Sequence, residues 1–175
     1  MAVITFNPNL AHAYNSRGFA YFMMGAYANA IADYTQALTL NPHSAMFYNN
    51  RGLAYSANGN YEAAIAEFTH IITIDPNNAV AYCNRGASYF KKGDLEKAIA
   101  DYFHTIRIDP KYINAYYNRG IAYYKRGDYA LAITDLKLVI SHAPNDAGAK
   151  EALELTRKAV PWGALKVPGT EFAPQ

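Results

Sequence analysis

The chain has 175 residues, of which 51% are apolar, so it is long enough to bury a continuous core. Its net charge of +2 is too small to indicate nucleic-acid binding, and no apolar run approaches the roughly 18 residues of a membrane span. The single cysteine, Cys83, excludes an internal disulfide and favours a reducing compartment, and residues 1–10 do not resemble a secretory signal. We therefore expect a cytoplasmic protein with neither nucleic acid nor membrane as partner.

The predicted elements follow one period of 34 residues. A glycine recurs at this spacing, as Gly18, Gly52, Gly86 and Gly120. Tyrosines lie four residues before each glycine and three after it, so the three residues share one face of a helix. An alanine (Ala30, Ala64, Ala98 and Ala132) and a proline (Pro42, Pro76, Pro110 and Pro144) follow in each period. A fixed period of this length predicts a solenoid of stacked units.

In chain order, residues 1–10 are predicted to be the remnant of an upstream repeat or a lead-in, because Val3–Pro8 resembles Ala37–Pro42. Four repeats follow over 11–44, 45–78, 79–112 and 113–146. Their helices are expected at 11–24, 27–40, 45–58, 61–74, 79–92, 95–108, 113–126 and 129–141, separated by glycine, aspartate, asparagine and proline signals. A polar-backed helix over 147–160 is predicted to cap the stack, and the proline- and glycine-rich residues 161–175 are predicted to form an extended tail.

This pattern resembles the tetratricopeptide repeat (TPR) family over residues 11–146. The resemblance implies an all-α fold, a right-handed superhelical solenoid of antiparallel helix pairs, here with four tandem repeats and a capping helix. The chain departs from the usual pattern before each glycine, where the family has an apolar residue. These positions hold Arg17, Arg51, Arg85 and Arg119.

Each of these arginines is followed sixteen residues later by an acid, namely Asp33, Glu67, Asp101 and Asp135. One acid for each arginine predicts a ladder of ion pairs between helices, because a partly buried arginine needs a carboxylate to offset its desolvation. A catalytic or phosphate-binding role for the arginines is the alternative. The pattern leaves open whether each acid serves its own repeat or the neighbouring one.

The opposite face of each first helix is the candidate binding surface, because in TPR proteins this face lines a concave groove for extended peptides. The resemblance implies that Asn50, Asn84 and Asn118 form a row whose amides offer donors and acceptors to a peptide backbone. The alternative is that these asparagines only solvate the groove. The candidate groove residues are Asn15, Phe19, Met23, Met46, Asn49, Asn50, Leu53, Asn84, Lys91, Asn114, Tyr117, Asn118 and Lys125.

The chemistry of these candidates changes along the chain. The first two repeats offer apolar side chains and no lysine, whereas the last two offer Lys91 and Lys125. The expected ligand is therefore a protein or peptide that is extended, with apolar and acidic parts. The family's clamp for chaperone carboxylates is not expected, because Asn15, Val80 and Asn84 occupy its basic positions.

No catalytic or cofactor-binding pattern accompanies the repeats. His70 and His104 are equivalent residues of successive repeats, and no histidines are spaced i, i+4, so no metal site is expected. We therefore expect a non-catalytic scaffold or adaptor without a cofactor, which binds a peptide through the asparagine row. The alternative is a structural or self-assembly unit whose ends or C-terminal tail mediate homo-oligomerisation.

Overall fold

The structure is a computed structural model, and it describes residues 8–160. Over this range it contains nine α-helices and no strand. The helices are α1 (Pro8–Met23), α2 (Tyr27–Leu40), α3 (Ala45–Ala57), α4 (Tyr61–Ile74), α5 (Ala79–Lys92), α6 (Leu95–Ile108), α7 (Ile113–Arg126), α8 (Tyr129–His142) and α9 (Ala147–Ala159). The predicted tail and the first seven residues of the predicted lead-in lie outside the described residues.

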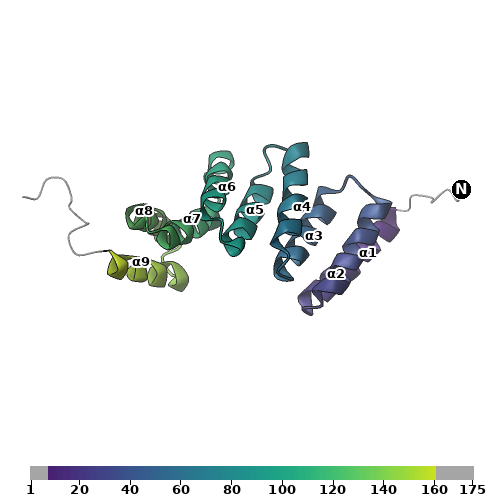
Figure 1. The fold of residues 1–175 in the computed structure, drawn as a ribbon, viewed down its shortest axis with the longest axis horizontal. Coiled ribbons are helices and arrows are strands. Elements are labelled where there is room, and N and C mark those ends of the chain that lie inside the picture. The colour runs from purple at the N-terminus through teal and green to yellow at the C-terminus, as the bar shows by residue number, and fades with distance from the viewer. Residues whose placement is uncertain (1–7, 161–175) are drawn as a thin grey trace, which may run out of the picture. The chain divides into compact units, whose positions relative to one another are not determined.

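The helices pack as consecutive pairs, α1 with α2, α3 with α4, α5 with α6 and α7 with α8 (Figure 1). They belong to two compact units, one with α1–α6 and the other with α7–α9. In the first unit, α2 also packs on α3, and α4 packs on α5. Among the first helices, α3 contacts both α1 and α5. In the second unit, α9 packs on α8 and contacts α7. The predicted all-α helical-repeat fold is therefore confirmed.

Local sequence sets the helix ends. The side chains of Asn60, Asn78 and Asp94 each accept a hydrogen bond from the backbone N–H three residues later, as capping residues do. Gly93 ends α5 with φ of +93°, a conformation that strains residues with a side chain. The first helix begins at Pro8, earlier than the expected residue 11, because proline needs no N–H partner in a first helical turn.

The recurring glycine allows the two helices of a repeat to approach closely. A Cβ atom added to Gly86 would lie 2.9 Å from Cε1 of Tyr102, and one added to Gly52 would lie 2.8 Å from Cζ of Phe68. Both rings are buried, so they fill the space above the glycine. The glycine therefore allows close helix packing, and a large side chain from the second helix completes that contact, an aromatic ring in the first three repeats and Leu136 in the fourth.

The four arginines form the predicted ladder of ion pairs. Nε and Nη2 of Arg85 each donate to one oxygen of Asp101 at 2.8 Å. The same pairing joins Arg17 to Asp33, Arg51 to Glu67 and Arg119 to Asp135, with shortest N–O distances of 2.7–2.9 Å. The prediction is confirmed, and the structure shows that every acid belongs to the repeat of its own arginine.

Each central arginine also joins its repeat to the preceding one. Nη1 of Arg85 donates to Oγ1 of Thr69 on α4 at 3.1 Å, and Arg51 makes the equivalent bond to Thr35 on α2. The guanidinium carbon of Arg85 lies 5.4 Å from the ring centroid of Tyr82 and 6.0 Å from that of Tyr89. The recurrent tyrosines therefore enclose the cation, and its hydrogen bond to Asp101 raises the pKa of Arg85.

Removal of one arginine tests the ladder. Arg85→Ala leaves the buried Asp101 carboxylate without its cation, so we expect the free energy of unfolding to fall by roughly 3 kcal/mol. Lys91→Ala, on the exposed side of the same helix, should change it by less than about 0.5 kcal/mol. Urea denaturation followed by circular dichroism measures both, and equal losses would show that the pair is structurally minor.

Candidate functional site

One face of the first helices remains open after the repeats have packed. We call it the first-helix face, and in the first unit it consists of His12, Ser16, Phe19, Met23, Met46, Asn50, Leu53, Ala57, Val80, Asn84, Ala87 and Lys91. Each of these residues is exposed or half-buried, whereas the glycines on the opposite face are buried. Four large apolar side chains are strongly exposed here, with exposed fractions of 54% for Phe19, 68% for Met23, 46% for Met46 and 45% for Val80. The face thus offers apolar surface to a partner.

In the second unit, α7 carries the remaining candidates. Asn114 and Lys125 are exposed, and Asn118 and Tyr117 are half-buried. A Cβ atom added to Gly148 on α9 would lie 3.4 Å from the Tyr117 hydroxyl. Tyr117 therefore lies against the capping helix, a contact that its position in the repeat did not reveal.

The asparagines connect neighbouring first helices. Nδ2 of Asn50 donates to Oδ1 of Asn15 at 2.8 Å, and Nδ2 of Asn84 donates to Oδ1 of Asn49 at 2.9 Å. Each of these two amides thereby uses one of its two N–H groups, and its side-chain oxygen has no partner in the described part of the chain. This bond between repeats was not predicted, because the sequence alone does not show which asparagines meet.

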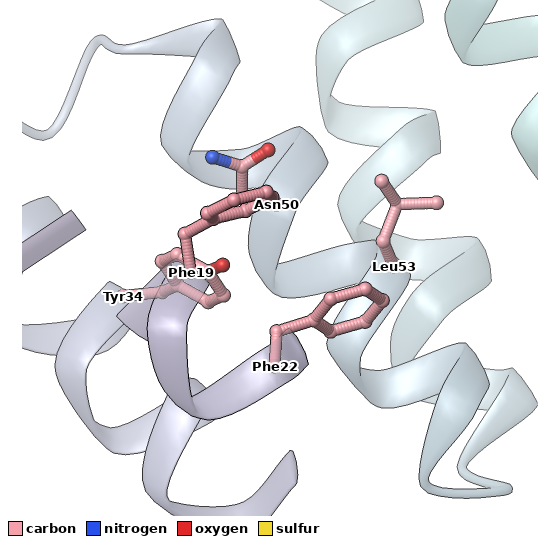
Figure 2. Close-up of a pocket in the computed structure, with 5 residues that line it drawn as sticks. All are labelled: Phe19, Phe22, Tyr34, Asn50 and Leu53. Carbon is pink, nitrogen blue, oxygen red and sulfur yellow. The ribbon is translucent and has the colours of Figure 1, made fainter. Parts of the chain in front are cut away.

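A small pocket lies on the first-helix face between α1, α2 and α3 (Figure 2). Its volume is about 40 Å³, and it is lined by Phe19, Phe22, Tyr34, Asn50 and Leu53. Three of these residues were predicted from the sequence, but Phe22 and Tyr34 were not. Phe22 follows Phe19 by one helical turn, which is a usable signal, whereas Tyr34 was recognisable only as a packing residue under Gly18.

Tyr34 is a buried residue whose polar group reaches this pocket. Its exposed fraction is 1%, its ring covers Gly18, and Figure 2 shows its hydroxyl beside Phe19. No group in the described part of the chain forms a hydrogen bond with this hydroxyl. Burial and the neighbouring Asp33 raise the pKa of Tyr34, so the hydroxyl stays protonated at neutral pH.

The basic side chains near this face differ in their partners. Lys92 pairs with Glu62 of α4 at 3.1 Å, and in the second unit Arg126 pairs with Asp128. Lys91 is exposed and has no acidic partner among residues 8–160. Lys91 is therefore the lysine of the first-helix face whose charge is available to a ligand.

The other reactive residues are accounted for by packing. His70 packs against Tyr48 with the two rings tilted, and His104 stacks on Tyr82, with ring centroids 4.2 and 5.1 Å apart. The Cys83 thiol is buried. Within the described residues, no three histidine, cysteine or acidic side chains form a group that could hold a metal ion. Nor does that part of the chain contain a helix long and apolar enough to cross a bilayer.

The fold and the open face define a helical-repeat protein, and sequence comparison identifies its family. Tetratricopeptide repeat models match residues 11–44, 113–146 and 33–66, and a TPR repeat model matches residues 54–93 and 86–127. The chain belongs to the tetratricopeptide repeat family. A comparison with curated proteins gave no match.

Solved structures share this fold. MamA is 24% identical, with a TM-score of 0.75 over 86% of this chain and 82% of MamA. The second TPR domain of human RPAP3, solved with the HSP70 peptide SGPTIEEVD, is 30% identical, with a TM-score of 0.62 over 65% of this chain and 94% of that domain. YrrB, described as a TPR protein with an unusual peptide-binding site, is 21% identical, with a TM-score of 0.72 over 82% of this chain and 74% of YrrB.

Proposed function

We propose that the chain is a non-catalytic scaffold or adaptor that binds an extended segment of a partner protein along its first helices. The observation that carries this proposal is the open first-helix face, where Phe19, Met23, Met46 and Val80 expose apolar surface beside a pocket. Methionine side chains adapt to several ligand shapes. The peptide bound to the related RPAP3 domain supports this class of ligand. We also propose that the protein acts in the cytoplasm, where its single cysteine stays reduced.

The row of asparagines is proposed to hold the ligand backbone. Because Asn50 and Asn84 are each tied to the preceding first helix, their amides are oriented before a ligand arrives. Each retains a side-chain oxygen and one N–H for a peptide group. In the second unit, we propose that Asn114, Asn118 and Lys125 of α7 serve the same purpose.

The ligand is proposed to be apolar where it meets α1 and α3 and acidic where it meets Lys91. We expect peptide arrays to select such sequences, and we expect their affinity to fall as salt rises, because salt screens the lysine charge. Lys91→Gln should weaken the binding of acidic peptides by up to about 1 kcal/mol. Lys92→Gln is the matched control, since its ammonium already pairs with Glu62. Basic best binders, or salt-independent acidic ones, would contradict the proposal.

A pair of substitutions separates ligand contact from contact between repeats. Asn84→Ala should weaken the binding of the best array peptide by about 1 kcal/mol, which is the scale of one lost hydrogen bond. Asn49→Ala deletes the same bond between helices but keeps the Asn84 amide, so its effect on affinity should be smaller. Calorimetry measures both affinities and circular dichroism checks the fold. Equal losses would assign the effect to the bond between helices.

Self-association is the second candidate, and a side of α1 that no helix of residues 8–160 covers favours it. A cavity of about 270 Å³ lies there, lined by Leu10, Ala13, Tyr14 and Arg17. The Arg17 side chain is 60% exposed, against 17% for Arg51, which a preceding repeat covers. This surface is proposed to receive a helix of a second copy, in a head-to-tail contact.

Light scattering over a range of concentrations tests self-association. We expect the mass of the native chain to rise with concentration and that of Ala13→Arg to remain monomeric, because the exposed Ala13 borders the cavity. A chain ending at Val160 reports separately on the tail. A monomeric mass for the native chain at every concentration would rule out this candidate.

A further inference from the structure

The hydroxyl of Tyr34 is a polar group that the packing of the first repeat leaves without a partner. The residue has an exposed fraction of 1%, and the hydroxyl lies at the pocket of Figure 2. Within the described residues the only fully buried side-chain nitrogen or oxygen atom without a hydrogen-bond partner is Nε of Arg51, so the Tyr34 hydroxyl keeps contact with the solvent of the pocket. A group bound in the pocket would supply the missing partner.

Packing alone does not require a hydroxyl at this position. In the second repeat the equivalent residue is Phe68, which is fully buried over its own glycine, and in the fourth it is Leu136. The third repeat has Tyr102, whose pKa is raised by burial and by the neighbouring Cys83. The fold of the first repeat therefore does not depend on the Tyr34 hydroxyl.

The pocket limits the shape of its occupant. A volume of about 40 Å³ suits a short side chain of a few heavy atoms, and Phe19, Phe22 and Leu53 form apolar walls. The wall also contains two polar groups, the Tyr34 hydroxyl and the Asn50 amide. Because Nδ2 of Asn50 already donates to Asn15, its oxygen remains as an acceptor.

A single hydroxyl has the chemistry that both polar groups can use. Its oxygen can accept from the Tyr34 O–H, and its own proton can be donated to Oδ1 of Asn50. A methyl group on the same carbon would contact the apolar walls. Threonine combines these two features in one short side chain, whereas serine lacks the methyl group and valine lacks the hydroxyl.

We propose that this pocket is an anchor site for a threonine side chain of an extended peptide, an inference that rests on the proposed peptide-binding function. Water that fills the empty pocket would use the same two polar partners. A threonine hydroxyl replaces those hydrogen bonds when it displaces such water, and a valine methyl group does not. The pocket thereby selects between two side chains of nearly equal shape.

The test uses two blocked amino acids of matched shape, N-acetyl-threonine-N-methylamide and N-acetyl-valine-N-methylamide. Each is titrated into the full chain and followed by the NMR signals of Phe19 and Leu53. We expect the threonine probe to bind at least about fivefold more tightly, which is the scale of one hydrogen bond. In Tyr34→Phe, a change that gives the first repeat the ring already present at Phe68, the two probes should bind equally.

Tyr102→Phe is the matched control, because it makes the same change in the third repeat and should leave the preference for threonine intact. Equal affinities on the native chain, no shift at the pocket with either probe, or a preference that survives Tyr34→Phe would overturn the proposal. Array peptides distinguish the two levels of inference. If the array peptides bind in a Lys91-dependent manner while the two probes show no preference, only the proposed threonine site is refuted. If neither the array peptides nor the probes bind the first-helix face, the proposed peptide-binding function is refuted as well.

Discussion

The arginine that precedes each recurring glycine holds the helix pair together. It forms two charge-assisted hydrogen bonds with an acid on the second helix, and in the second and third repeats it also reaches a threonine of the preceding repeat. The tyrosines one turn before and after it supply flat apolar surface for the guanidinium. In the second, third and fourth repeats the arginine side chain is largely shielded from water, which strengthens the pair, whereas Arg17 in the first repeat is 60% exposed.

This use of one side of each first helix determines which side remains exposed. The glycine and arginine positions face the second helices, so Phe19, Asn50 and Val80 lie on the open side. Asparagine bonds between successive first helices stabilise this side without covering it. The repeated core therefore supports a surface whose residues are free to differ from one repeat to the next.

We expect ligand recognition to depend on the surface residues that differ between repeats. The residue over the glycine is tyrosine in the first repeat and phenylalanine in the second, and either ring satisfies the packing. Phe19 is likewise replaced by Leu53 one period later. Such exchanges leave the backbone unchanged and alter the shape and polarity of a pocket, which is how one repeat architecture serves many ligands.

The sequence by itself determined the number and approximate positions of the helices over residues 11–146 and the presence of one acid for each arginine, because a 34-residue period repeats every local signal and the sixteen-residue arginine–acid spacing four times. It also placed Phe19, Asn50 and Leu53 on one surface. The structure decided that α1 begins at Pro8 and that each acid pairs with the arginine of its own repeat. Only the tertiary structure decided that Asn15 and Asn49 accept bonds from the next repeat, that Tyr117 lies against α9, and that the Tyr34 hydroxyl is left unpartnered at a pocket. These contacts join residues of different helices at distances set by side-chain packing, and periodicity specifies a face but not the atoms that meet there.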